Sequence, residues 1–401
     1  MNESLKLAQI TRTENQPLSS VERFGPESAA KARAFHSSFP EYQATPLVNL
    51  KELAQSLGVA SIHVKDESYR FGLNAFKVLG GSYTIGNYIA GMLGLDISEL
   101  PYDRLVSEEI REKTGELTFV TATDGNHGRG VAWTANRLGQ KSVVYMPKGS
   151  ALERLENIRK LGADASITEF NYDDAVRLAK KGADEHGWVM VQDTAWQGYE
   201  EIPGWIMEGY TTMALEATEQ LQGEKPTHVF LQAGVGAMSG AVTGYFSALY
   251  GKDRPVITIV EPNKADCLYR TALANDGQLH FVTDDMQTIM AGLACGEPCT
   301  IGWEVLRDHA DNFISMPDYV AAEGMRIMGN PLPGDPRIIS GESGAATLGL
   351  VAEIMRNSSM AKIRKALKLD EHSRILCFST EGDTDKENYR RIVWDGLHPS
   401  F

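Results

Sequence analysis

The sequence predicts an α/β protein with two domains built on mostly parallel, open sheets. From about residue 117, short apolar runs alternate with longer stretches in which apolar residues recur at helical spacing. Strands that alternate with helices favour parallel sheets covered by helices on both faces. The chain has 401 residues, 42% hydrophobic and 23% charged, which is an ordinary globular composition and enough for two domains.

The first series of expected elements lies between residues 117 and 191. Its short apolar runs predict buried strands at 117–121, 142–146, 165–168 and 188–191. The amphipathic stretches between them predict helices at 130–138, 152–161 and 173–185. Residues 96–113 are polar and weakly periodic, and they predict a surface excursion that contains a helix.

The same alternation resumes after residue 200. Strands are expected at 228–232, 256–261 and 374–378, and helices at 203–221, 239–250, 317–328 and 345–355. Because no long Gly/Ser linker appears, the domain boundaries are expected at short crossings near residues 90 and 197. The large domain would then comprise residues 1–90 and 198–401, and the small domain residues 91–197.

The charge of the chain argues against several classes of partner. Lys and Arg number 39 against 53 Asp and Glu, which gives a net charge of −14 at pH 7. Such a surface repels nucleic-acid phosphates and anionic membranes, so neither is an expected partner. No signal-peptide pattern and no run near the ~20 apolar residues of a membrane span is seen. The four cysteines suit a reducing cytoplasm, and no metal site is expected.

Lys77 stands in the segment GLNAFKVLGGSY, whose residues are almost all apolar or small. Poor solvation of an ammonium favours the neutral amine, which is the form that a Schiff-base lysine needs. An isolated lysine at the start of a helix more often extends its amine to solvent. Taken alone, the segment favours that second interpretation.

Residues 121–130, TATDGNHGRG, form a turn between an expected strand and an expected helix. In α/β folds ligands bind at the carboxyl ends of the strands, where this turn lies. Asp124 offers an acid or base there, and Asn126 offers an amide. Asp and Asn are also common helix N-caps, so both interpretations stand. His127 is expected to be structural.

Residues 234–240, GVGAMSG, also lie between a strand and a helix. Small residues let backbone N–H groups converge on an anion at a helix N-terminus, which predicts a phosphate cradle. The spacing G-x-G-x-x-x-G is one residue longer than the dinucleotide fingerprint, and no Gly-Lys-Ser/Thr follows to make a nucleoside-triphosphate loop. Glu261, at the end of the next strand, leaves an NAD-dependent dehydrogenase as one alternative. A non-catalytic α/β binding protein is another.

Residues 375–385, ILCFSTEGDTD, predict a buried strand that ends in hydroxyls and acids. In this order, the four segments together resemble the fold-type II pyridoxal-5′-phosphate enzymes, the threonine dehydratase and tryptophan synthase β group. The likeness runs from about residue 65 to residue 385. Within that group, NAFKVLGGSY, TATDGNHGRGVAW, VQDTAW and STEGDTD are similar to the diaminopropionate ammonia-lyase family. The resemblance implies pyridoxal phosphate as cofactor, a small amino-acid substrate and a homodimer.

The resemblance also implies roles for individual residues. Lys77 matches the lysine that forms the Schiff base, Asn126 the asparagine that faces the cofactor's 3′-oxygen, and Thr380 the hydroxyl placed against the pyridine nitrogen. The remaining cofactor-binding residues would be Phe76, Gly234, Val235, Gly236, Ala237 and Met238. Thr123 and Ala75 would contact the substrate.

Two departures from the dehydratases of this group bear on the substrate. Those enzymes have a hydroxyl residue at position 124 that contacts the substrate carboxylate, whereas an aspartate there would repel it. Asp124 is therefore expected to meet an ammonium or to take a proton, and Asp193 in VQDTAW supplies a second acid. The dehydratases also usually have Ser at the position of Ala75. Two acids suit a substrate with two amino groups, 2,3-diaminopropionate.

The resemblance implies α,β-elimination from both the D and the L isomer, giving pyruvate and two ammonia. Lys77 would be the base for the L isomer and Asp124 the base for the D isomer, while Asp193 would bind the β-amino group. The nearest alternative is another β-eliminase or β-replacement enzyme of the same group, acting on serine, threonine or an activated serine. Asp124 and Ala75 argue against that alternative.

Overall fold

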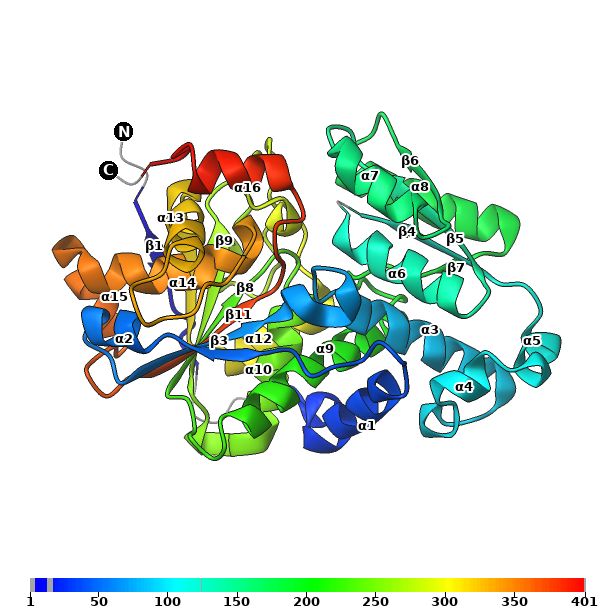
Figure 1. The fold of residues 1–401 in the computed structure, drawn as a ribbon, viewed down its shortest axis with the longest axis horizontal. Helices are drawn as coiled ribbons and strands as arrows, with labels where there is room; N and C mark the ends of the chain where they lie inside the picture. Colours follow the sequence, from blue (N-terminus) through cyan, green and yellow to red (C-terminus); the bar gives the residue numbers. More distant parts are fainter. Residues whose placement is uncertain (1–3, 13–16, 124, 400–401) are drawn as a thin grey trace. The chain divides into compact units, whose positions relative to one another are not determined.

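The computed structural model describes residues 4–12, 17–123 and 125–399. Contacts divide the chain into two compact units, each containing one open sheet flanked by helices (Figure 1). Unit 1 comprises Met1–Gly25, Thr45–Tyr69 and Met213–Phe401, and unit 2 comprises Pro26–Ala44 and Arg70–Thr212. The prediction of an α/β protein with mostly parallel sheets is confirmed.

Within the described residues, the sheet of unit 1 has seven strands in the order β1-β10-β9-β8-β11-β3-β2. The five central strands are parallel, and the edge strands β1 and β2 run antiparallel to their neighbours. The strands are β1 Lys6–Ala8, β2 Leu47–Asn49, β3 Ser61–Asp66, β8 His228–Gln232, β9 Val256–Pro262, β10 Asn312–Met316 and β11 Arg374–Ser379. The carboxyl ends of β8 and β11 therefore lie at the same edge of the sheet.

Apolar residues from α2, α13 and α14 pack with those of the central strands into one continuous core of unit 1. The α-helices of unit 1 are α2 Lys51–Leu57, α10 Ala237–Tyr250, α11 Cys267–Ala274, α12 Thr300–His309, α13 Asp318–Gly329, α14 Glu342–Arg356, α15 Ala361–Ala366 and α16 Lys386–Val393. Short 3₁₀ helices of the chain are η1 Glu22–Phe24, η2 Glu67–Gly72, η3 Ile97–Glu99, η4 Gly251–Asp253, η5 Ala291–Leu293 and η6 Ser358–Met360.

The sheet of unit 2 is parallel throughout, with the strand order β6-β5-β4-β7. Its strands are β4 Thr118–Ala122, β5 Lys141–Met146, β6 Asp164–Ile167 and β7 Val189–Met190. Its helices are α1 Pro26–Ser37, α3 Val78–Leu93, α4 Tyr102–Leu105, α5 Glu108–Thr114, α6 Asn126–Arg137, α7 Leu152–Arg159 and α8 Tyr172–His186. In β5, Val143 packs with α8, whereas Val144 packs with α6 and α7. Alternate residues of the strand thus serve the two faces of the sheet.

The strands predicted from residue 117 onward correspond to β4–β9 and β11, and the predicted helices to α6–α10, α13 and α14. The surface excursion predicted at 96–113 contains α4 and α5. Helix α6 begins at Asn126, earlier than the predicted residue 130. Strands β1, β2, β3 and β10 were not predicted.

The division into units differs from the expected domain boundaries near residues 90 and 197. Helix α3 belongs to unit 2, and α9 (Glu201–Gln220) passes from unit 2 into unit 1 between Thr212 and Met213. The physical reason lies in the contact of α3 with α6. A Cβ at Gly130 of α6 would lie 2.8 Å from the Cα of Val78, so the two backbones touch. Residues 70–90 are therefore packed with unit 2, whereas they were expected in the large domain.

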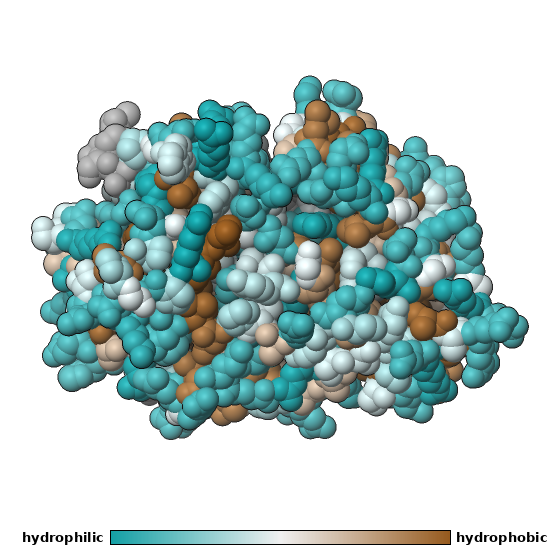
Figure 2. Space-filling view, viewed as in Figure 1, coloured by the Kyte–Doolittle hydropathy of each residue, from teal (hydrophilic) through white to brown (hydrophobic). Residues whose placement is uncertain are grey.

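The face of the molecule seen in Figure 2 is covered mainly by hydrophilic residues, with smaller apolar patches among them. This agrees with the acidic composition of the chain. Over the described residues, no helix is both long and apolar enough to cross a membrane.

Candidate active site

Lys77 directly precedes helix α3, at the end of a turn with unusual backbone conformations. Gly72 has a φ of +69° and Asn74 a φ of +57°, both in the left-handed region. Glycine and asparagine are the residues that tolerate this region best. Arg129 of α6 donates from Nη1 to the Leu73 carbonyl oxygen at 2.8 Å and so ties the turn to α6. The position of Lys77 is thus set by two glycine-dependent features, this turn and the close approach at Gly130.

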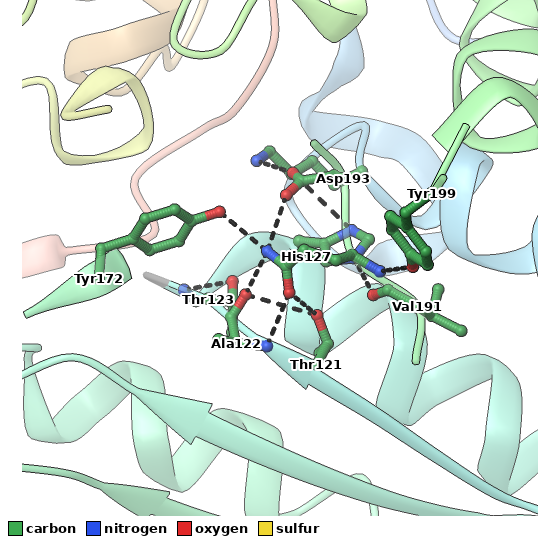
Figure 3. A network of polar contacts seen from close by, with 11 residues as sticks. Thr121, Ala122, Thr123, His127, Tyr172, Val191, Asp193 and Tyr199 are labelled. Atoms are coloured by element: carbon green, nitrogen blue, oxygen red, sulfur yellow. Dashed lines mark hydrogen bonds and ion pairs between the residues drawn. The ribbon is translucent and has the colours of Figure 1, made fainter. Parts of the chain in front are cut away.

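The residues beside Lys77 are buried, as their apolar character predicted. Ala75 is 3% exposed, and Phe76 is 7% exposed with its ring centroid 4.7 Å from that of Tyr210. The amine itself has a charged partner: Lys77 Nζ lies 2.6 Å from Asp193 Oδ2. Figure 3 shows Asp193 within a network of polar contacts. An ion pair favours the ammonium form, so the apolar neighbours of Lys77 along the chain are not the only influence on the charge of its amine.

The carboxylate of Asp193 is held in its charged form. Burial raises the pKa of Asp193, but the neighbouring Lys77 and His127 outweigh burial and lower the pKa to about 2. Because the folded-state pKa is depressed, the stability that this pairing contributes is complete above the ordinary value of about 3.9. It is lost as the pH falls from there toward 2. At neutral pH the site therefore presents a permanent anion to any ammonium group.

A buried glutamine side chain extends the pairing of β4 with β7 and places Asp193. The backbone ladder ends with a hydrogen bond from Val191 N to Val120 O. Beyond it, Gln192 Oε1 accepts from Ala122 N and Gln192 Nε2 donates to Ala122 O, each at 3.0 Å. Gln192 also bonds Thr121 Oγ1 and the Tyr172 hydroxyl, and both of these partners are labelled in Figure 3. The amide thus continues the sheet by one more step and holds the residue that follows it.

Tyr199 and His127 complete this network (Figure 3). The Tyr199 hydroxyl accepts from Gln192 N at 2.9 Å and donates to Met190 O at 2.9 Å. Burial raises the pKa of the Tyr199 phenol, so its hydroxyl keeps the proton that it donates to Met190 O. His127 is 1% exposed and donates from Nε2 to Val191 O at 2.8 Å, while its Nδ1 lies 4.0 Å from Asp193 Oδ2. His127 therefore braces the strand end and also lies beside the acid.

The asparagine loop lies between β4 and α6, where the sequence placed it. Thr123 is 1% exposed, and its Oγ1 accepts from Gly125 N at 3.0 Å. Asn126 is the first residue of α6, after Gly125 with a φ of +147°. Asp124, predicted as a base, lies outside the described residues. The described part of this loop is in unit 2, as are Lys77 and Asp193.

In unit 1 the glycine loop joins the end of β8 to α10. Gly236 has a φ of +95° and precedes the first residue of the helix, Ala237. A Cβ at Gly234 would lie 3.2 Å from both Cys295 Sγ and Gly292 O, so a larger residue would crowd the loop. The first hydrogen bond of the helix runs from Gly240 N to Gly236 O at 2.8 Å. The N–H groups of 237–239 consequently have no acceptor within the helix.

Thr380 follows β11 at the same edge of this sheet. It is 4% exposed, and its Oγ1 accepts from Gln232 Nε2 at 2.8 Å. Gln232 is the last residue of β8, and one residue, Ala233, separates it from the glycine loop. The Thr380 hydroxyl and the loop are thus linked through one side chain.

Each unit, taken by itself, presents groups that suit one part of pyridoxal phosphate. In unit 1, the helix N–H groups and the crowded glycine loop suit a phosphate, because they offer donors without a side chain in the way. The Thr380 hydroxyl suits a ring nitrogen. In unit 2, the amine of Lys77 suits an aldehyde.

The dehydrogenase alternative loses its support at Glu261. This residue is fully buried, and its carboxylate accepts from Leu268 N at 2.9 Å and from Tyr269 N at 2.6 Å. Burial raises the pKa of Glu261 well above its ordinary value. The side chain caps the start of α11 and is not presented to a ribose.

Sequence reasoning missed Gln192, Tyr199 and Gln232. Both glutamines stand at the end of an apolar strand, Gln192 directly before Asp193 and Gln232 two residues before the glycine loop. A polar side chain in such a position must find hydrogen-bond partners when buried, and this was the available signal. Tyr199 gave no signal, because its partner is a backbone group brought near by the fold.

Comparisons with known proteins agree with this geometry. Residues 39–381 match the family described as "Pyridoxal-phosphate dependent enzyme". The chain is 56% identical over 367 residues to a diaminopropionate ammonia-lyase of Salmonella typhimurium, covering 90% of this chain and 91% of that one.

Two solved structures of the diaminopropionate ammonia-lyase of Escherichia coli are similar to this chain over nearly its whole length. The complex with D-serine has a TM-score of 0.92 at 48% identity, covering 99% of this chain and 98% of that one. The complex with an aminoacrylate–pyridoxal-phosphate azomethine reaction intermediate has a TM-score of 0.90 at 49% identity, covering 98% of both.

Proposed function

Because the chain belongs to the pyridoxal-phosphate dependent enzymes and, within them, to the diaminopropionate ammonia-lyase family, we propose that it converts D- and L-2,3-diaminopropionate to pyruvate. It is a pyridoxal-phosphate dependent lyase that acts by elimination on a small amino acid. The full reaction consumes one water and releases two ammonia.

One observation carries the choice of substrate, the 2.6 Å ion pair between Lys77 Nζ and Asp193 Oδ2. In this pair a buried carboxylate contacts the side-chain nitrogen of Lys77, the residue proposed to hold the cofactor. When Lys77 is engaged by the cofactor, that carboxylate is released to take another cation. The β-ammonium of diaminopropionate is such a cation, whereas the β-hydroxyl of serine is not. We therefore assign binding of the β-amino group to Asp193.

When bound, pyridoxal phosphate supplies an electron sink for the pair left at Cα. The residues of the chain hold it and move the protons. The N–H groups of residues 234–238 would bind the phosphate, and the Thr380 hydroxyl would donate to the ring nitrogen. Asn126 would face the 3′-oxygen and Phe76 would lie against the cofactor, while Thr123 and Ala75 would line the substrate. A neutral donor such as Thr380 moderates the sink, which favours prompt loss of the β-amino group.

The two isomers need bases on opposite sides of Cα. Lys77 removes the Cα proton of the L isomer, and Asp124 removes that of the D isomer. Asp124 is a carboxylate at a position where the dehydratases of the group carry a hydroxyl, which supports its role as a base. The family resemblance also supports a homodimer that acts in the cytoplasm. Analytical ultracentrifugation measures the oligomeric state.

The decisive experiment compares pyruvate release from D- and L-diaminopropionate by the holoenzyme and three variants. Lys77→Ala is expected to abolish turnover of both isomers. Asp124→Asn is expected to lower turnover of the D isomer by about 10²- to 10⁴-fold and to spare much of the L activity. Lys148→Ala, at an exposed lysine, is the matched control and should retain both activities.

Two results would contradict the proposal. Full activity of Lys77→Ala would exclude the lysine and with it the proposed chemistry. Equal losses on both isomers in Asp124→Asn would exclude the two-base assignment and leave the elimination itself intact.

A further inference from the structure

In unit 1, one side-chain amide joins the ends of two neighbouring strands. Paired residues of β8 and β11 end at Phe230 and Cys377. Further along, Gln232 Nε2 donates to Phe378 O and to Thr380 Oγ1, each at 2.8 Å. Gln232 is 1% exposed and Thr380 is 4% exposed, so both hydrogen bonds are shielded from water.

The orientation of this amide follows from its partners. A carbonyl oxygen only accepts, so the atom of Gln232 that faces Phe378 O has to be the nitrogen. An amide nitrogen carries two protons and accepts none. One proton lies on Phe378 O and the other on Thr380 Oγ1. The Thr380 oxygen is therefore the acceptor in this bond, and its own proton points elsewhere.

We propose that Gln232 is a positioning residue that fixes the Thr380 hydroxyl as a hydrogen-bond donor toward the cofactor's ring nitrogen. A hydroxyl held in this way favours a nitrogen without a proton, because only that form accepts. The inference rests on the assignment of Thr380 under the proposed function. It adds that Gln232 makes the Thr380 hydroxyl the donor in the hydrogen bond to the ring nitrogen. Gln232 also lies two residues before Gly234, so the residue that bonds Thr380 is close in sequence to the glycine loop.

The test measures how strongly the full-length apoprotein distinguishes pyridoxal phosphate from the analogue whose ring nitrogen is replaced by C–H. Dissociation constants for both are obtained by titration, followed by cofactor absorbance. In the unaltered protein, one buried hydrogen bond is expected to favour pyridoxal phosphate by about 3- to 10-fold. Thr380→Val is expected to bring this ratio to about 1.

Two variants at position 232 test whether the direction of the Thr380 hydrogen bond matters, beyond the presence of the Thr380 hydroxyl. In Gln232→Glu the side chain accepts from Thr380 whether it is charged or protonated, because a protonated acid has one proton and uses it on Phe378 O. The hydroxyl then turns round, and the ratio is expected to fall to about 1 or below. Gln232→Met fills the space without an amide, and it is expected to give an intermediate ratio. Gln140→Leu removes an amide that bonds only backbone groups of unit 2 and should leave the ratio unchanged.

The outcomes test the role of Gln232 and the role of Thr380 separately. If Gln232→Met and Gln232→Glu weaken both ligands by the same factor, the residue is merely structural and the inference is overturned. If Thr380→Val abolishes the preference while both Gln232 variants keep it, the Thr380 assignment stands and only the role of Gln232 falls. If Thr380→Val keeps the preference, the hydroxyl does not face the ring nitrogen and the assignment of Thr380 is overturned.

Discussion

The carboxylate of Asp193 stays charged because a lysine and a histidine lie beside it in a buried setting. In the proposed role of Asp193, this anion would distinguish substrates by the charge of their β-substituent. Diaminopropionate offers an ammonium there, and serine offers a neutral hydroxyl.

Asp193→Asn keeps the size of the side chain and removes its charge. We expect kcat/KM for diaminopropionate to fall by about 10- to 100-fold, the loss of one charge-assisted contact. The value for serine is expected to change little, so the preference between the two substrates narrows. Steady-state kinetics on both substrates measure this.

The control for this variant is Asp308→Asn in unit 1, which also alters a buried aspartate, in this case one paired with Arg307. It should leave the substrate preference intact. Parallel losses on diaminopropionate and serine in Asp193→Asn would mean that the residue supports the fold and does not read the β-group.

At this scale the sequence predicted the groups that carry charge but not those that orient them. Lys77 and Asp193 were found through short motifs in which an unusual residue type stands out. Gln192 and Gln232 each bind a partner on another strand, so their roles depend on pairings that no local pattern shows. The expectation of a neutral Lys77 considered its neighbours along the chain only. The fold added a carboxylate from a distant segment.

Helices α3 and α6 touch through backbone at the residue that follows Lys77. The Cβ of an alanine at position 130 would lie 2.8 Å from Val78 Cα and 2.9 Å from Val78 N, atoms that cannot move aside cheaply. Gly130→Ala is expected to lower the free energy of unfolding by about 1–3 kcal/mol, as overpacking does. Because the displaced backbone adjoins Lys77, activity is expected to fall as well. Urea unfolding and pyruvate release measure the two effects.

Gly91→Ala is the matched control, because Gly91 is an exposed residue within α3 with no atom near the position of an added Cβ. It is expected to raise stability by about 0.5–1 kcal/mol, since alanine loses less backbone entropy in a helix. If both substitutions changed stability alike, the close approach of α3 and α6 would not be what Gly130 provides.

The elements that could be predicted share a strong local pattern. Strands such as β8, His228–Gln232, are apolar runs between turn signals, and the pattern identifies them. Strand β3 escaped prediction because Ile62 and Val64 are its only apolar residues and the strand ends in the charged pair Lys65 and Asp66. Lys65 is fully buried and paired with Glu216 at 2.7 Å, so a charged residue occupies a core position. A partner supplied by the fold makes such a strand possible, and the sequence shows no trace of it.

For the whole molecule, binding of the cofactor is linked to stability. A ligand that binds only the folded chain stabilises it by about 2.7 kcal/mol when present at 100 times its dissociation constant. The holoprotein is therefore expected to unfold at a higher temperature than the apoprotein, as differential scanning calorimetry would show. Pyridoxal, which lacks the phosphate, should give a smaller rise because it leaves the glycine loop without its ligand. Equal unfolding temperatures for apoprotein and holoprotein would contradict the assignment of the cofactor residues.

The arrangement of the chain into units was the least predictable feature. Two parallel sheets follow from the alternation of strands and helices, and both are present. The assignment of residues 70–90 depends on contacts such as Val78 with Gly130, which join parts of the chain far apart in sequence. Local periodicity carries no information about such contacts, so the expected boundary near residue 90 differs from the division between the units, which falls before α3 at Arg70.

The pairing of Lys77 with Asp193 has a consequence for the apoprotein, before pyridoxal phosphate binds. Aldehydes react with amines only when these are free of a proton, and here a carboxylate keeps the proton in place. The aspartate proposed to bind the substrate therefore lowers the reactivity of Lys77 toward aldehydes until the cofactor binds.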